Sequence, residues 1–153
     1  MEKPNLINPL RMQIRIVLFF IVALFIENAF SVNEAQMKAA VKLIKNTCKT
    51  KTKITDEQID KMHQGIWDDT DEVSKCYVYC ALGMMKLRDK GGAYNPELAE
   101  KQIPQIPESI RDTLVPSLRN CANAGEGLTK KCDLSFAFFK CVYFDDPEHY
   151  MFP

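Results

Sequence analysis

The sequence has few of the residues on which common catalytic sites depend. Only two histidines occur in 153 residues, and they stand far apart, at His63 and His149. No Ser/His/Asp motif can be placed, although such a triad is defined by its arrangement in space. A small secreted phospholipase would need a glycine-rich calcium loop and a His-Asp pair beside a cysteine, and neither is present. These absences argue against an enzyme, and we expect no cofactor.

An excess of basic charge is also missing. The chain has 20 Lys and Arg residues against 20 Asp and Glu residues, and the two signs are interspersed as on a solvated surface. Nucleic-acid binding is typically marked by a basic patch or stripe, and membrane lysis by a basic amphipathic face. Both classes are therefore disfavoured, whereas a secreted inhibitor stays open as an alternative.

The amino terminus indicates export. Lys3, Arg11 and Arg15 precede an apolar run of eleven residues, 16–26, which suits a signal peptide and is shorter than the ~20 residues of a membrane-spanning helix. Small residues at Ala29 and Ser31 predict cleavage after Ser31. We expect residues 1–31 to be a signal peptide and 32–153 to be one soluble, secreted domain. An uncleaved membrane anchor is the alternative.

Six cysteines with unequal spacing are the most informative feature. They are separated by 27, 3, 40, 10 and 8 residues, at Cys48, Cys76, Cys80, Cys121, Cys132 and Cys141. An even number in a short exported chain indicates a disulfide framework. Cys76 and Cys80 lie one helical turn apart and are poorly placed to join each other, which leaves twelve of the fifteen possible connectivities. A zinc site is disfavoured because no second close pair or nearby histidine accompanies them.

Apolar periodicity predicts helices and almost no strand. We expect helices at about 33–48, from Thr55 to near Gly65, 71–88, from Asn95 to Pro104, 109–123 and 133–142. Thr55 and Gln58 form a capping-box pattern, and Asn95-Pro96 is a typical helix start. The third helix is apolar on two faces and should be central, and Pro116 should kink or restart the fifth. The sixth is apolar nearly all round.

This cysteine spacing resembles that of the insect odorant-binding proteins with six cysteines, the pheromone and general odorant-binding type. In that family three residues separate the second and third cysteines and eight separate the last two. The secreted start, six helices and chain length agree. The resemblance implies an all-α bundle of about six helices, held by three interlocked disulfides around an apolar cavity. The implied pairs are Cys48–Cys80, Cys76–Cys132 and Cys121–Cys141.

The resemblance also implies a ligand site in the interior. The residues expected to contact a ligand are apolar or aromatic: Met62, Trp67, Leu82, Met85, Leu114, Phe138, Phe139, Val142, Tyr150 and Phe152. For any single one of them, ordinary core packing is the alternative. Trp67 could cover the pocket entrance or pack on the surface, and the Tyr150 hydroxyl could orient a polar ligand group. No metal is expected.

The resemblance further implies that the carboxyl-terminal segment covers the pocket. Acidification would neutralise Asp145, Asp146 and Glu148, charge His149 and loosen this segment as a lid. A frayed, solvated terminus is the alternative. The expected function is olfaction: a secreted, extracellular carrier that transports odorants or pheromones and takes part in the sensory perception of smell. Its partners would be a small hydrophobic alcohol, ester or fatty-acid-like ligand and an olfactory receptor. A carrier in taste or another secreted fluid is an alternative.

Overall fold

The computed structural model describes residues 12–18 and 33–153. The chain divides into two units, Met1–Ser31 and Val32–Pro153, and each is described by itself. In the first unit, residues 12–18 form a short exposed helix. The expected signal peptide falls largely outside the described residues and stays a prediction. None of the helices in the described ranges has the length and hydropathy to cross a membrane.

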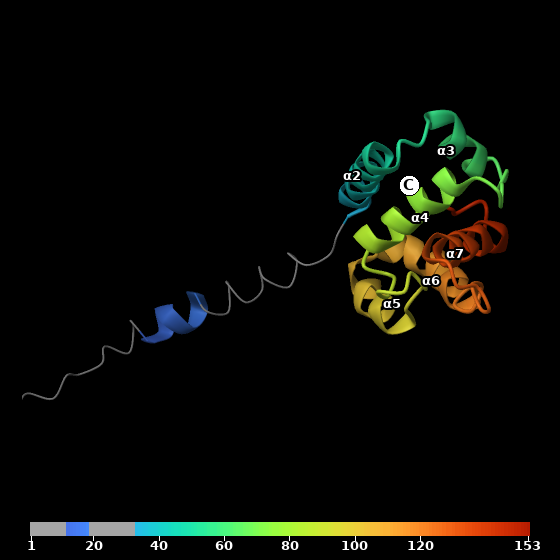
Figure 1. Cartoon of the computed structure of the whole chain (residues 1–153). Helices are drawn as coiled ribbons and strands as arrows, with labels where there is room; N and C mark the ends of the chain where they lie inside the picture. Colours follow the sequence, from blue (N-terminus) through green and yellow to red (C-terminus); the bar gives the residue numbers. More distant parts are fainter. Residues whose placement is uncertain (1–11, 19–32) are drawn as a thin grey trace, which may run out of the picture. The chain divides into compact units, whose positions relative to one another are not determined.

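The second unit is helical, with no strand among its described residues (Figure 1). Its α-helices and one 3-10 helix follow in the order α2 (Glu34–Thr52), α3 (Asp56–His63), α4 (Glu72–Met84), α5 (Pro96–Gln102), η1 (Ile103–Gln105), α6 (Glu108–Asn120) and α7 (Lys131–Asp145). The all-α architecture expected from the sequence is confirmed. An isolated bridge between Arg88 and Tyr94 closes the loop after α4.

Side-chain caps define where several helices begin. Thr55 and Gln58 form the predicted capping box on α3, and Asn33 with Gln36 forms a second one on α2. Asn95 accepts a hydrogen bond from the N–H of Leu98, with Pro96 in the first position of α5. These side chains satisfy N–H groups that the first turn of a helix leaves unpaired.

Several helices end a few residues from the expected positions, and the first and third expected helices differ most. The third helix stops at Met84 because Lys86 adopts a left-handed conformation with φ of 58°. The N–H of Leu87 then bonds to the carbonyl of Leu82, and that of Lys86 to Gly83, which is a Schellman ending. The first helix continues to Thr52. Residues 49–52, which extend it beyond the expected end at 48, include Lys49 and Lys51, and lysine is a good helix former.

Pro116 does not restart a helix, because α6 runs through it without interruption. The dense apolar character of α7 is explained by burial, since Phe136, Phe138, Phe139 and Val142 are all buried. The α4 helix packs against α2 and α7, which confirms its central place. Tyr77, Val78 and Leu82 are buried on it, while Met84 and Met85 are only partly covered.

Three disulfides join the helices, and each of the six cysteines takes part in one. They are Cys48–Cys80, Cys76–Cys132 and Cys121–Cys141, the same pairs that the resemblance implies. The first joins α2 to α4, the second α4 to α7, and the third the end of α6 to α7. Along the chain, the first cysteine pairs with the third, the second with the fifth and the fourth with the sixth, so the disulfide-bounded loops overlap.

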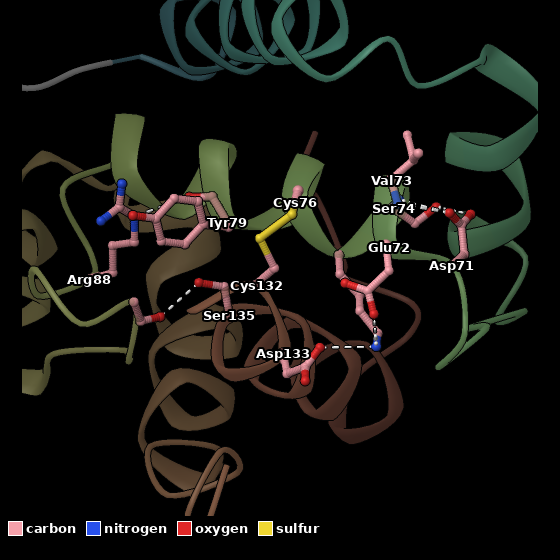
Figure 2. Close-up of a disulfide and its surroundings, with 12 residues drawn as sticks. Asp71, Glu72, Val73, Ser74, Cys76, Tyr79, Arg88, Cys132, Asp133 and Ser135 are labelled. Carbon is pink, nitrogen blue, oxygen red and sulfur yellow. Dashed lines mark hydrogen bonds and ion pairs between the residues drawn. A yellow bond between two sulfur atoms is a disulfide. The ribbon is translucent and has the colours of Figure 1, made fainter. Parts of the chain in front are cut away.

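The contact between α4 and α7 is reinforced around the central disulfide. Figure 2 shows Cys76 joined to Cys132, with Asp133 and Ser135 beside it. Lys75 is only 8% exposed. Its ammonium nitrogen lies 2.9 Å from a carboxylate oxygen of Asp133 and 3.1 Å from one of Glu72. Hydrogen bonds to Asp133 and Glu72 raise the pKa of Lys75. A buried charge is thereby paired on two sides, as a low-dielectric site requires.

Asp71 caps α4 and offers a direct test of this local structure. Its carboxylate accepts hydrogen bonds from the N–H groups of Val73 and Ser74, the Ser74 hydroxyl and the Gln58 amide. We expect Asp71→Ala to lower the free energy of unfolding by about 1–2 kcal/mol in urea denaturation at pH 7. The matched variant Asp112→Ala, at an exposed helical site, should change it by less than about 0.5 kcal/mol.

The effect of Asp71 should depend on pH. Burial alone would raise the pKa of its carboxyl, but the hydrogen bonds from Ser74, Gln58 and Val73 outweigh it and lower this pKa. The stabilisation is therefore complete above about pH 4, the ordinary pKa of an unfolded Asp, and is lost as the pH falls through the lowered value. A difference between variant and wild type that grew on acidification would contradict this assignment.

Candidate functional site

An apolar cleft with a volume of about 390 Å³ lies between α2, the end of α4, the α5–α6 region and the last residues of the chain. One wall is the apolar face of α2, made by Met37, Ala40, Val41 and Ile44. The opposite walls come from the pair Met84-Met85, from Ile106, Leu114 and Leu118, and from Phe152. Its size is within the range of small-molecule pockets, about 300–1,000 Å³.

A disulfide joins two of the helices that line the cleft. The Cys48–Cys80 disulfide ties α2 to α4 beside Ile44 and Met84. The polar side chains in its wall are those of Lys86, Gln102 and Gln105. Methionine side chains adapt to ligands of varied shape because they are unbranched and polarisable. The cleft is therefore suited to an apolar molecule.

The last residues of the chain form part of this site. Phe152 and Pro153 are buried, and the Phe152 ring lies 4.6 Å from that of Phe139, edge to face. Tyr150 packs against the rings of His63 and Tyr143 at 5.5 and 5.2 Å. In Figure 1 the C label lies beside α2, α3 and α4. The terminus thus packs on the bundle and contributes a wall.

The structure places the predicted ligand residues in four settings. Met85, Leu114 and Phe152 line the cleft. Tyr150 lines a smaller hollow of about 210 Å³ next to it. Phe138 stacks on Tyr94 with ring centroids 4.0 Å apart, beside a separate hollow. The remaining five are buried core residues: Met62, Trp67, Leu82, Phe139 and Val142. Ligand contact by any of them stays a prediction.

Two buried polar groups lie near the aromatic part of the core. The indole N–H of Trp67 and the hydroxyl of Tyr77 have no hydrogen-bond partner among the described residues. Burial raises the pKa of Tyr77, and that of Tyr150 well above its ordinary value, so both hydroxyls are neutral and able to donate. Trp67 is buried against Phe136, Tyr143 and Tyr150, which differs from a position on the surface.

The four residues of the expected pH-operated lid lie before the buried end of the chain. His149 Nδ1 is 2.9 Å from the carboxylate of Asp146, and Asp145 accepts hydrogen bonds from the Asn120 amide. Glu148 is exposed. Charging His149 would strengthen its pair with Asp146 for as long as that carboxylate stays ionised. The lid stays a prediction.

Sequence reasoning missed the α2 wall of the cleft. Apolar periodicity predicted a helix at 33–48, but not that its side chains Met37, Val41 and Ile44 are only partly covered and that Ala40 is exposed. Ile106 and Leu118 were also not predicted as site residues. An apolar stripe has the same period whether it packs in a core or lines a cleft, so no signal in the sequence separates the two.

Comparisons with known proteins agree with this geometry. The model of the PBP/GOBP family matches residues 31–144. General odorant-binding protein 72 of Anopheles gambiae is 30% identical over 124 residues, which cover 80% of this chain and 100% of that protein. General odorant-binding protein 19a of Drosophila melanogaster is 30% identical over 115 residues, 72% of this chain and 77% of the relative.

Solved structures show the same fold. Odorant binding protein 4 of Chrysopa pallens superposes with a TM-score of 0.74 at 37% identity, over 80% of this chain and 99% of that one. Odorant binding protein 5 of Apis mellifera does so with a TM-score of 0.71 at 24% identity, over the same shares. The family match spans most of the chain, and the six cysteines, three disulfides and helical bundle agree with it. The chain therefore belongs to the PBP/GOBP family, as a relative of the insect odorant-binding proteins.

Proposed function

We propose that the protein is a secreted carrier that reversibly binds small hydrophobic odorants or pheromones and keeps them in solution in extracellular sensory fluid. The observation that carries this proposal is the apolar cleft of about 390 Å³ between α2, α4 and the end of the chain. Family and fold support a carrier of small ligands. The names of the relatives support odorants as the ligand class.

The energetics favour binding without chemistry. Burying apolar ligand surface contributes about 25 cal/mol per Å², so covering a few hundred Å² supplies several kcal/mol before the entropy of binding is subtracted. Nothing in the cleft wall apart from Lys86 is ionisable. The site thus binds a lipophile by removing it from water. In the proposed function, the bound ligand is later released to a receptor.

A fluorescence titration tests the proposal. Protein secreted by cells that express the full chain would be titrated with the lipophilic probe N-phenyl-1-naphthylamine, then with long-chain alcohols and esters as competitors. We expect saturable one-to-one binding, complete displacement and no turnover of the esters. Absence of binding, in a protein shown to be helical and fully oxidised, would contradict the carrier function. Equal affinities at pH 5 and pH 7 would contradict the pH-operated lid.

A matched pair of variants localises the site. Ala40→Trp places an indole in the mouth of the cleft, because Ala40 is exposed and lines it. Leu43→Trp adds the same ring on the same helix at a residue that is 63% exposed and lies outside the cleft wall. We expect the first variant to weaken probe binding about tenfold or more, a loss of ~1.4 kcal/mol, and the second to leave it unchanged. Equal effects would place the probe elsewhere.

A further inference from the structure

A second hollow adjoins the apolar cleft and differs from it in charge. It has a volume of about 350 Å³ and lies between α2, His63 at the end of α3, and the residues Met151, Phe152 and Pro153. Three of its wall residues, Met37, Val41 and Phe152, also line the apolar cleft. The two hollows are therefore neighbours that share an apolar partition.

One edge of this hollow is a row of lysines. Lys38, Lys42 and Lys45 line it, at helix positions i, i+4 and i+7, which lie on one face of α2. Lys49 continues the row but is paired with Asp56. Within residues 33–153, by contrast, Lys38, Lys42 and Lys45 form no ion pair with an Asp or Glu side chain. Three lysines without a direct ion-pair partner thus border an apolar surface, and Lys45 also contributes, after Lys49, to lowering the pKa of the Asp56 carboxyl.

None of the residues that line the hollow beside this row is an Asp or Glu. The end of the chain contributes the apolar side chains of Met151, Phe152 and Pro153. From α3, burial lowers the pKa of His63, the charge of Lys45 lowers it further, and Asp60 opposes the shift. His63 is therefore neutral at pH 7. The acidic Glu148 and its neighbour His149 line a different hollow.

We propose that this hollow binds the carboxylate of a fatty-acid-like amphiphile, whose head group faces Lys38, Lys42 and Lys45 while its aliphatic chain lies against Met37, Val41 and Phe152. This proposal rests on the proposed carrier function and specifies its ligand class. An alcohol or ester of equal length would gain the same apolar burial but no attraction to the lysines. The protein should therefore prefer the acid to the neutral analogues.

Competition with chain-matched ligands tests the proposal. Dodecanoate, 1-dodecanol, methyl dodecanoate and dodecylamine would each displace the neutral probe from the wild-type protein at pH 7.4, below their aggregation concentrations. We expect dodecanoate to bind about tenfold more tightly than the alcohol, a difference of ~1.4 kcal/mol in binding free energy. Three partly exposed charge pairs between the carboxylate and the lysines, of up to ~1 kcal/mol each, can supply this difference. Dodecylamine should bind most weakly. Raising the ionic strength to about 1 M should reduce the preference, because charges are then screened within ~3 Å.

A variant with Lys38→Gln, Lys42→Gln and Lys45→Gln should lose this preference and keep its affinity for 1-dodecanol. The matched control is Lys90→Gln, Lys101→Gln and Lys130→Gln, which removes three exposed lysines away from the hollow and changes the net charge equally. It should keep the preference for the acid. Equal loss in both triple variants would show that only overall charge matters and would overturn the proposal.

The histidines supply an independent readout. Because His63 lines the hollow and His149 does not, dodecanoate should raise the pKa of His63 in an NMR titration and leave the ring signals of His149 at pH 7.4 in place, whereas 1-dodecanol should not raise the pKa of His63. If the alcohol and the acid bind equally and His63 does not respond, the head-group site is wrong while the carrier function stands. If the probe does not bind at all, the carrier function itself fails.

Discussion

Replacing both Cys76 and Cys132 by alanine should lower the free energy of unfolding by about 4 kcal/mol. This is a large part of the ~5–15 kcal/mol by which folded domains are usually stable. The bond joins residues 56 positions apart, so its removal greatly increases the conformational freedom of the unfolded chain. Urea denaturation of the oxidised variant, followed by circular dichroism, measures the change. The Lys75–Asp133 ion pair remains in the variant and preserves part of the α4–α7 contact.

The third disulfide provides the matched comparison. Cys121 and Cys141 lie only 20 positions apart, so the same double replacement there should cost about 1 kcal/mol less in the chain-entropy model. Both variants remove one bridge from α7, and both leave four cysteines that can pair as in the wild type. A smaller loss for the Cys76–Cys132 pair than for the Cys121–Cys141 pair would contradict this explanation by loop length.

Phe139→Ala should lower the free energy of unfolding by about 3–5 kcal/mol, the usual cost of removing a buried phenylalanine ring. Phe139 is 1% exposed and packs edge to face on Phe138 and Phe152, at 5.8 and 4.6 Å. Its loss leaves a cavity and removes the surface on which the end of the chain packs. The variant should therefore also bind the lipophilic probe more weakly, because Phe152 is a wall of the cleft.

Phe144→Ala is the control on the same helix. Phe144 is 59% exposed, so its removal should change the free energy of unfolding by less than about 0.5 kcal/mol and leave probe binding intact. Equal destabilisation by the two variants would show that the end of α7, rather than the core around Phe139, determines stability. A loss below about 1 kcal/mol for Phe139→Ala would contradict its place in a packed core.

Local features of the fold could be predicted because short-range physics decides them. The capping residues Thr55 and Asn95 act within three positions of the chain, and the apolar stripes of the central helix follow from a period of 3.6 residues. The carboxyl-terminal ends of the helices were harder to predict from the sequence. The left-handed residue Lys86 that ends α4 is a lysine, whereas the usual signal is glycine or asparagine.

The sequence by itself determined an all-α chain with six unequally spaced cysteines and an apolar terminus, because residue type and periodicity contain that information. The tertiary structure decided which apolar residues became core and which became wall. Phe139 and Met37 both belong to apolar helix faces, yet one is buried and the other lines a cleft. The tertiary structure also decided which lysine of α2 forms an ion pair, since Asp56 pairs with Lys49. Both outcomes depend on how closely helices that are far apart in sequence approach one another. Residue type and apolar periodicity contain no information on the distances between helices.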